Sequence, residues 1–423
     1  MTSFESRRRF SPFPDPRRTP LRVIVIGAGL GGLCLAQGLR RAGIDVAVYE
    51  RDVSASARAQ GHRLHIDGRG RDALSATLPP HLFRLIAAIA GRPAPNINGF
   101  DPQLRPTGVF ALDDSALESA TAGGLMPTHA VIDRQVLRRV LLSGLGDIVH
   151  FGRRCVGYDS EASTVTARFA DGSSAWGSVL VAADGVGSAI RAQRLPHAQV
   201  VDSQVRLVYG RVPLTSDLRS ALPPHMVSSV FNSVVGPGNR FVGIAPVQYR
   251  LPPAKAAIRL APEIDFPPTG DTLAAMFGCR LDCLGLSDTQ LRAASGRRLR
   301  ELVLEHLSGW HPLITRIVER WTPSSIYPIT VRSSVPVPPW PTSNVTLLGD
   351  AIHAMSPAAG AGANIALRDA ATLAAALTEV ATGRPLSDAV GDYEREMIDE
   401  GFRMVRLSAA SGTRILAADP LPE

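Results

Sequence analysis

Three glycines and one carboxylate near the start of the chain have the types and spacing of a phosphate-binding turn. Gly27, Gly29 and Gly32 form a G-x-G-x-x-G pattern, and Glu50 follows 18 residues after Gly32. The first glycine allows a tight turn, the second lets the backbone approach a pyrophosphate, and the third lets a helix pack closely on a strand. A carboxylate at this spacing accepts hydrogen bonds from an adenosine ribose and disfavours a 2′-phosphate. The pattern predicts a site for FAD or NAD without separating the two.

The segments around these residues predict the strand-helix-strand unit that such a turn requires. Residues 21–26 are apolar and β-branched, which is typical of a strand buried on both faces. Residues 33–42 favour a helix that stops at Gly43, and residues 44–49 predict a second strand. The start of the helix, next to Leu30, would present free N–H groups and a positive dipole end to the phosphates.

Two further acid-and-glycine pairs follow strand-like segments later in the chain. Asp184-Gly185 comes after residues 178–183, and Gly349-Asp350 comes after residues 344–348. A long helical stretch is predicted from about residue 364 to residue 380. The order of these three motifs resembles the aromatic hydroxylases, a family of single-component FAD-dependent monooxygenases typified by para-hydroxybenzoate hydroxylase. The family's late motif, G-D-A-x-H-x-x-x-P-x-x-G-x-G-x-N, is matched throughout by residues 349–364, and the resemblance extends over residues 21–405.

The late motif has a physical logic that agrees with the resemblance. Asp350, at the end of a strand, is placed to hydrogen-bond the ribityl hydroxyls of FAD. Gly360 and Gly362 permit the backbone to lie against the flat ring system, and a helix that begins near Ala363 points its positive end at the N1/O2 edge of the flavin. The resemblance adds Pro357 and Asn364 as cofactor contacts and places Asp184 near the pyrophosphate. His353 is expected to brace the backbone.

Several other residues are implied at the cofactor by the same resemblance. Arg134 opens a helix in an R-x-x-L segment and would contact the phosphate or ribityl region, with Asp133 as a helix cap. Arg51 would flank the adenosine, and Arg63 would face the flavin ring or the incoming nicotinamide. Arg63 and His65 are weak candidates for catalysis; the catalytic base is otherwise unknown, because the flavin carries the chemistry.

The middle of the chain is predicted to bind the substrate. Residues 201–335 lack nucleotide motifs and contain strand-like runs at 204–213, 226–235 and 240–248. Tyr209 and Arg211 in this region, and Met355 beside the flavin, are candidate substrate contacts. The expected fold is α/β, with a Rossmann-type FAD-binding domain, a mixed, mainly antiparallel substrate sheet and a C-terminal helix.

The expected boundaries leave a disordered lead at residues 1–20. A discontinuous FAD-binding domain would comprise residues 21–200 and 336–423, with parts of 60–130 contributing to the substrate side, and residues 201–335 would form the substrate domain. The C-terminal helix is predicted over residues 388–407.

Composition restricts the partners. The formal charge is +7 across 423 residues, but the arginines are scattered and no aromatic-interleaved basic block suggests nucleic-acid binding. No run of about 18 apolar residues predicts a membrane span. The four cysteines form neither a disulfide framework nor a zinc pattern, and no other metal-ligand cluster stands out. A cytoplasmic monomer or homodimer acting on a small molecule is expected.

The reaction implied by the resemblance is monooxygenation of an aromatic or polyketide-like substrate. NADH or NADPH would reduce FAD from outside, because no second Rossmann turn is found, and O2 would react to give a flavin C4a-hydroperoxide that hydroxylates the substrate. Epoxidation and Baeyer–Villiger insertion use the same chemistry and remain open. The motifs are also compatible with a flavin reductase that does not oxygenate and with a non-catalytic flavin- or ligand-binding protein.

Overall fold

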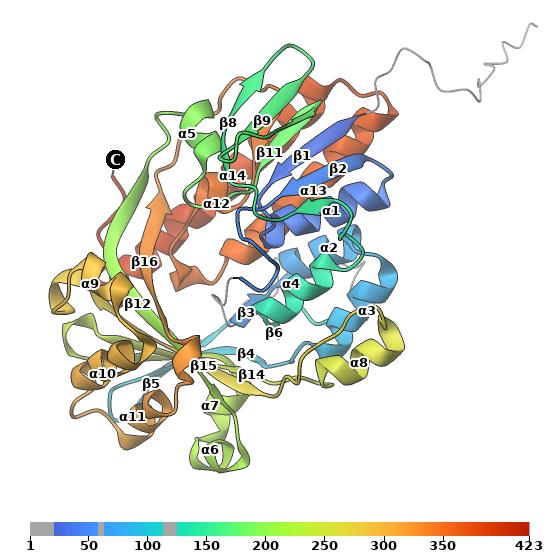
Figure 1. Ribbon diagram of the computed structural model, residues 1–423. Coiled ribbons are helices and arrows are strands. Elements are labelled where there is room, and N and C mark those ends of the chain that lie inside the picture. Colours follow the sequence, from blue (N-terminus) through green and yellow to red (C-terminus); the bar gives the residue numbers. More distant parts are fainter. Residues whose placement is uncertain (1–20, 58–62, 113–124, 423) are drawn as a thin grey trace, which may run out of the picture.

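The computed structural model describes residues 21–57, 63–112 and 125–422 (Figure 1). The lead predicted at residues 1–20 lies outside this range. The described chain forms two lobes, an upper one around a parallel sheet and a lower one around a larger mixed sheet. The α/β class, the Rossmann-type unit, the mixed sheet and the C-terminal helix are all confirmed.

The parallel sheet brings three distant parts of the chain side by side. Strand β1 (Arg22–Ile26) lies between β2 (Asp45–Tyr49) and β11 (Val179–Ala182), and β17 (Val345–Leu347) pairs with β11. A short strand, β7 (Val149–His150), closes the edge next to β2. Because all pairs are parallel, the carboxyl ends of the strands share one edge of the sheet. The glycine turn, Asp184 and Asp350 follow three of these ends, and they therefore meet at that edge.

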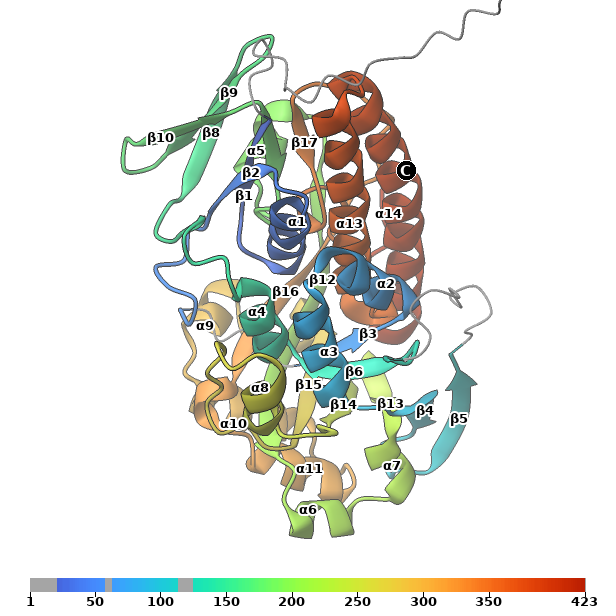
Figure 2. The same ribbon diagram turned by 90° about the vertical axis from the view of Figure 1, so that its right-hand side faces the viewer.

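Helices cover one face of this sheet and a small antiparallel sheet covers the other. Figure 2 shows α1 (Leu30–Arg41), α13 (Gly362–Thr382) and α14 (Leu386–Leu416) in a layer on one side. On the opposite side lie β8 (Cys155–Ser160), β9 (Val165–Phe169) and β10 (Ser174–Gly177). The core strand β1 is correspondingly apolar and buried on both faces, with Val23, Ile24 and Val25 fully buried.

The lower lobe is built on a seven-stranded sheet. All its neighbouring strands are antiparallel except β4 and β13. In spatial order its strands are β16 (Tyr327–Ser334), β12 (Val200–Pro213), β15 (Thr272–Arg280), β14 (Phe241–Val247), β13 (Ser229–Val235), β4 (Ala94–Phe100) and β5 (Pro106–Ala111). The strand-like run predicted at 226–235 was partly wrong. Its first three residues belong to α7 (Pro224–Ser228), which starts with a proline at a position where helices tolerate the missing N–H.

The alternation of side chains along β12 gives the two faces of this sheet different functions. Val208 and Val212 pack into a core with the helices α9 (Asp288–Ala293), α10 (Gly296–His306) and α11 (Pro312–Glu319). Leu207, Tyr209 and Arg211 point to the opposite face, which lines a cavity facing the upper lobe. The substrate sheet is therefore braced from outside and open toward the parallel sheet.

A two-stranded ribbon lies between the lobes (Figure 2). It consists of β3 (Arg63–Ile66) and β6 (Ala130–Asp133), which runs directly into α4 (Arg134–Leu142). The remaining helices of the first half are α2 (Gly68–Thr77), α3 (Pro80–Ile89) and α5 (Ala189–Arg194). Among the helices of the described ranges, none has both the length and the apolar character needed to cross a membrane.

Candidate functional site

One large cavity, of about 2020 Å³, lies between the two lobes. Its walls combine the strand ends of the parallel sheet with the open face of the seven-stranded sheet. Every predicted cofactor residue except Asn364 lines it. These residues are Gly27, Gly29, Leu30, Gly32, Glu50, Arg51, Arg63, Arg134, Asp184, Asp350, Pro357, Gly360, Gly362 and Ala363.

The glycine turn is shaped by three different constraints. Gly27 has φ +110°, and a Cβ there would lie 2.3 Å from the carbonyl oxygen of Ala183. A Cβ on Gly32 would lie 2.1 Å from the carbonyl oxygen of Gly27, so this glycine is needed for the close packing of α1 on the turn. Gly29 differs, because no described atom lies within 4 Å of its Cβ position. The turn is therefore compact behind Gly27 and Gly32 and open to the cavity at Gly29.

Glu50 is positioned by the same turn. Its Oε2 accepts a hydrogen bond from the Ala28 amide at 2.7 Å, and its Oε1 accepts one from the Asp52 amide at 2.9 Å. These two bonds fix the carboxylate at the end of β2, where it is largely buried but still reaches the cavity. The position suits a ribose diol, which donates hydrogen bonds to a fixed carboxylate.

Asp184 and Asp350 are two carboxylates that the protein does not fully satisfy. Asp184 Oδ2 accepts from the Ala189 amide at 3.0 Å, whereas its Oδ1 is buried and has no hydrogen-bond partner in the described chain. Burial raises the pKa of the Asp184 carboxyl above its usual value, and burial does the same for Asp350 against the lowering effect of His353 and Arg134. A buried acceptor such as Asp184 Oδ1 is normally satisfied, and the Asp350 carboxylate is exposed in the cavity wall, so both carboxylates fit a ligand that carries hydroxyl donors.

Two helix N-termini open into the cavity. Neither α1 nor α13 has a side chain that caps its first turn. Gly360, with φ +64°, leads the chain into α13, and Gly362 and Ala363 at its start line the cavity. The first N–H groups of a helix without a cap need external acceptors, and the positive end of the helix dipole attracts negative charge. The α1 end suits a pyrophosphate and the α13 end suits an electron-rich ring edge.

His353 braces this region instead of lining it. The imidazole is buried, and its Nε2 donates to Asp369 Oδ2 at 2.6 Å. The same carboxylate oxygen also accepts from the Gly349 amide at 3.0 Å. Burial lowers the pKa of His353, but the carboxylates of Asp369 and Asp350 outweigh it and leave the pKa above its usual value. Helix α14 crosses here at Gly401, where a Cβ would lie 2.5 Å from the imidazole.

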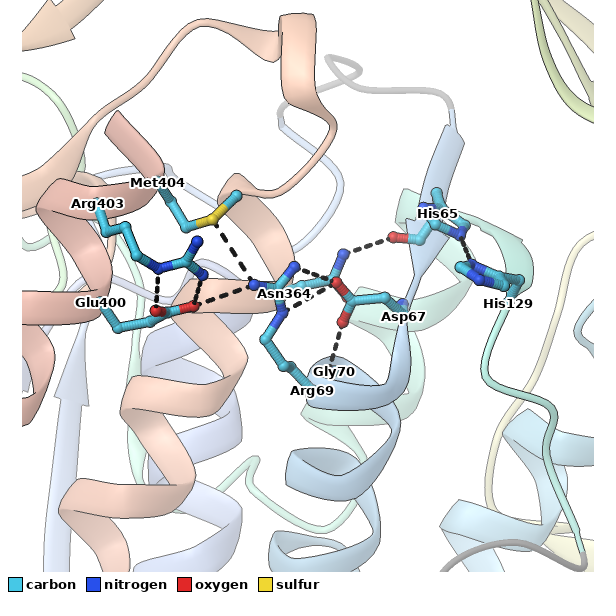
Figure 3. A network of polar contacts seen from close by, with 9 residues as sticks. All are labelled: His65, Asp67, Arg69, Gly70, His129, Asn364, Glu400, Arg403 and Met404. Carbon is cyan, nitrogen blue, oxygen red and sulfur yellow. Dashed lines mark hydrogen bonds and ion pairs between the residues drawn. The ribbon is translucent and has the colours of Figure 1, made fainter. Parts of the chain in front are cut away.

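Asn364 is placed behind the cavity wall. Its Oδ1 accepts from the Asp67 amide at 3.1 Å and its Nδ2 donates to the His65 carbonyl at 2.9 Å (Figure 3). It is fully buried, and a Cβ on Gly70 would lie 2.3 Å from its Oδ1. With its amide committed in this way, Asn364 ties the start of α13 to β3 and α2.

An ion-pair network extends this attachment to α14 (Figure 3). Arg69 pairs with Asp67 at 2.6 Å and with Glu400 at 3.1 Å, and Arg403 also bonds to Glu400. Sequence reasoning missed this network, because its members are separated by more than 330 residues and share no motif.

The arginines predicted on α4 and β2 have distinct positions. Arg134 begins α4, and Asp133 caps that helix by accepting from the amides of Gln135 and Val136. Arg51 is exposed at the rim. Arg138 was not predicted, although it lies one helical turn after Arg134; its guanidinium holds the glycine turn through the Ala28 carbonyl at 3.1 Å.

The substrate candidates Tyr209, Arg211 and Met355 all line the cavity. Arg211 pairs with Asp133 Oδ2 at 3.2 Å, and Tyr209 stacks on Tyr327 with ring centroids 5.7 Å apart. Burial raises the pKa of Tyr209 far above its usual value, so the phenol stays protonated. The rest of this wall is largely apolar and comes from Ile97, Leu207, Val230, Phe231, Phe241, Met276, Ile415 and Leu416.

The last two of these residues belong to the end of α14, which sequence reasoning missed. The predicted helix ended at residue 407, whereas α14 continues to Leu416. The sequence signal for this longer helix is the spacing of two small residues, Ser408 and Gly412, which are four apart and lie on the buried side of α14.

Arg63 and His65 line the cavity where the ribbon faces the lower lobe. His65 Nε2 and His129 Nδ1 share a hydrogen bond of 2.8 Å. Burial, followed by the charge of Arg63 and the neighbouring His129 and Arg69, lowers the pKa of His65 to about 3. His65 is therefore neutral at physiological pH.

Comparison with known families agrees with both halves of this site. The pattern of an NAD(P)-binding Rossmann-like domain matches residues 25–91, and that of an FAD binding domain matches residues 318–408. Among solved structures, a protein of Photorhabdus luminescens assigned as an FAD-containing monooxygenase is 30% identical, with a TM-score of 0.78, over 93% of this chain and 98% of that one. Klebsiella pneumoniae HpxO, crystallised with FAD and uric acid, is 25% identical with a TM-score of 0.73, over 93% and 88% of the two chains.

Curated relatives also include FAD-dependent monooxygenases. A dual O-methyltransferase/FAD-dependent monooxygenase of Phaeosphaeria nodorum is 32% identical over 86% of this chain and 41% of its own length. One of Cercospora beticola is 31% identical over 93% and 46%, so the chain spans less than half of these relatives. The similarity to the Photorhabdus protein, by contrast, extends over more than nine-tenths of each chain. The chain belongs to the FAD-dependent monooxygenases and has the fold of the FAD aromatic hydroxylases.

Proposed function

We propose that this protein uses NADH or NADPH and O2 to hydroxylate an aromatic or polyketide-like small molecule. The observation that supports this most is the continuity of the cavity: one space of about 2020 Å³ joins the dinucleotide-type edge of the parallel sheet to the apolar face of the seven-stranded sheet. Ligand pockets usually measure about 300–1000 Å³. A cavity of twice the upper value has room for FAD and a ring-shaped substrate together.

The residues that would hold FAD divide by the part of the cofactor that each suits. The open backbone at Gly29 and the N-terminus of α1 would receive the pyrophosphate, and Glu50 the adenosine ribose. Asp350 would accept from ribityl hydroxyls, Asp184 Oδ1 is free to accept another donor, and the N-terminus of α13 would face the N1/O2 edge. Bound FAD would supply the oxygen chemistry, taking electrons from the nicotinamide and activating O2.

The chain's own contribution is to position the substrate and exclude water. Phe231, Phe241 and Met276 give the substrate side an apolar wall, which favours a flat or hydrophobic ligand. The positive end of α13 would stabilise negative charge on the reduced ring without any side chain changing its protonation state. No nucleophilic side chain is needed.

Epoxidation is a second candidate, favoured by one similarity. A chloroplastic zeaxanthin epoxidase of Oryza sativa is 26% identical over 94% of this chain. Hydroxylation and epoxidation both add one oxygen atom, so the position of that atom in the product decides between them.

The test is a coupled measurement on the purified protein. We expect bound FAD in its absorption spectrum and an NADH or NADPH oxidation rate that rises when a phenolic or polyketide aromatic substrate is added. O2 consumption should rise in parallel. Oxidation of the nicotinamide that reduces an added electron acceptor, with no O2 consumed, would identify a reductase instead.

A further inference from the structure

Arg63 is a cation in the cavity for which the described chain provides no counter-charge. Its Nη2 donates to the Val230 carbonyl on β13, while its Nε is buried without a hydrogen-bond partner in the described ranges. None of the described carboxylates forms an ion pair with it. Residues 58–62, which precede it, contain no acidic side chain. Burial lowers the pKa of the Arg63 guanidinium to about 9, which measures how poorly the cation is compensated.

The neighbouring charged groups are all committed elsewhere. Asp133 lies opposite Arg63 in the β3–β6 pair, but its two oxygens cap α4 and bind Arg211. Arg69 on α2 is balanced by Asp67 and Glu400. His65 adds no counter-charge, since its lowered pKa leaves the imidazole neutral and its Nε2 is bonded to His129. In the part of the chain that the structure describes, Arg63 is therefore left without a counter-charge.

The position of Arg63 points toward the substrate side of the cavity. The N-terminus of α13 is tied to β3 at His65 and Asp67 through Asn364. Arg63 precedes His65 by two residues on β3, which places it roughly 6–7 Å along the strand from that attachment. From there its guanidinium reaches across to β13 of the seven-stranded sheet, beside the apolar wall at Phe231. The helix end would already serve the negative edge of a reduced flavin, which leaves Arg63 for a second anion.

We propose that Arg63 anchors an anionic oxygen of the substrate, either a carboxylate or a phenol or enol oxygen that loses its proton on binding. This inference rests on the proposed function and specifies the substrate as an acid. The guanidinium has planar N–H donors that can bind a carboxylate in two parallel hydrogen bonds or a single oxygen in one. For a phenol or enol, the O–H bond breaks, the proton passes to water, and the charge left on oxygen pairs with Arg63.

The experiment compares the affinity of the FAD-bound protein for matched acidic and methylated probes. The pairs are 2-naphthoate with methyl 2-naphthoate, and 2-naphthol with 2-methoxynaphthalene, titrated between pH 6 and 10 by calorimetry. We expect at least one acid to bind about ten- to a hundredfold more tightly than its methylated partner, the range of a charge-assisted hydrogen bond. A preference limited to naphthoate identifies a carboxylate, and one that develops as naphthol ionises identifies a phenolate.

Variants then assign the preference to Arg63. Arg63→Gln should bring the ratio of acid to methylated affinity close to one, and Arg63→Lys should retain part of it. Arg259→Gln, at an exposed position on α8 (Pro253–Leu260), should behave as the wild type. The flavin midpoint potential is measured in the same proteins. If Arg63→Gln shifts this potential but keeps the preference for acids, the guanidinium acts on the flavin and not on the substrate, and the proposal is overturned.

The ratio of acid to methylated affinity in the wild-type protein decides the question even where a variant loses FAD or fails to fold. A wild-type protein that binds neither acid more tightly than its methylated partner contradicts the proposal. This outcome can be told apart from failure of the proposed function. If the protein is yellow and its O2 uptake is stimulated by substrate, but it shows no preference for acids, only the role of Arg63 is refuted.

Discussion

At the scale of single residues, the site depends on which glycines face the protein and which face the cavity. Gly32 is enclosed by backbone, whereas the Cβ position of Gly29 is empty. The sequence pattern predicted both glycines but not this difference, because it arises from the path of the chain after Ala183 and the angle of α1. A spacing rule states that a glycine is needed, and only the packing shows whether the fold or the ligand needs it.

Two alanine substitutions separate these requirements. Gly29→Ala should fold normally, since its backbone (φ −75°, ψ −176°) accepts any residue, but it should lower FAD affinity at least about tenfold by placing a methyl group at the pyrophosphate. Gly32→Ala should destabilise the apoprotein by about 1–3 kcal/mol or more through overpacking. Urea unfolding of the apoproteins and FAD titration measure both effects. Equal FAD affinity in wild type and Gly29→Ala would contradict the assignment.

The His353–Asp369 pair gives a pH dependence with a definite sign. Because the pKa of His353 is raised in the folded protein, the pair adds stability that is fully present below the unfolded pKa of about 6.5 and is lost as the pH rises through the higher folded value. Asp369→Asn should therefore lower the free energy of unfolding by about 3–5 kcal/mol at pH 6 and by less at pH 9. The control is Asp399→Asn, at an exposed position of α14. A loss of equal size at both pH values would show that proton linkage is not involved.

At the scale of elements, the chain joins the start of α13 to β3, α2 and α14 through polar side chains. Asn364 was predicted from a motif as a cofactor contact, and its side chain is instead bound to the backbone of Asp67 and His65. The motif predicted the position of Asn364 at the start of α13 but not the hydrogen bonds of its side chain. The physical reason is that a motif records position along the chain, whereas the function of an amide depends on which backbone groups fold against it.

Removing this attachment should affect both stability and the cofactor. Asn364→Ala leaves the Asp67 amide and the His65 carbonyl buried without a partner, at a cost of about 1–3 kcal/mol for each. We expect a lower midpoint in thermal unfolding and faster loss of FAD on dialysis. Thr382→Ala, at the exposed far end of the same helix, is the matched control. If Asn364→Ala loses FAD no faster than Thr382→Ala does, the hydrogen bonds of Asn364 are not what holds α13 at the flavin.

At the scale of the whole molecule, the two lobes make one cavity from segments that are distant in the chain. The parallel sheet could be predicted because each of its strands is short, apolar and followed by a motif with chemical meaning. The substrate sheet could be predicted only as a class. Its β4 and β5 come from residues 94–111, its outer face is covered by α9, α10 and α11, and α14 ends against its cavity side. These contacts depend on tertiary packing that no local pattern encodes.

The same difference explains why the cofactor side is better defined than the substrate side. Backbone groups and glycines bind the invariant parts of a dinucleotide, so their spacing carries information. Substrate contacts are side chains on alternating strand positions, and any apolar residue with the correct alternation satisfies the fold. Tyr209 and Arg211 lie on the cavity face of β12, as the alternation requires, but their partners Tyr327 and Asp133 became known only from the structure.

The measurement that tests the central claim most directly is turnover under ¹⁸O2. The FAD-bound protein is incubated with NADPH or NADH and an aromatic acid or phenol that stimulates nicotinamide oxidation, and the products are analysed by mass spectrometry. We predict a product that carries one oxygen atom derived from ¹⁸O2, with the second atom appearing in water. A product oxygen derived from water, or oxidation of the nicotinamide that yields only reduced O2 species with every such compound, would contradict the claim.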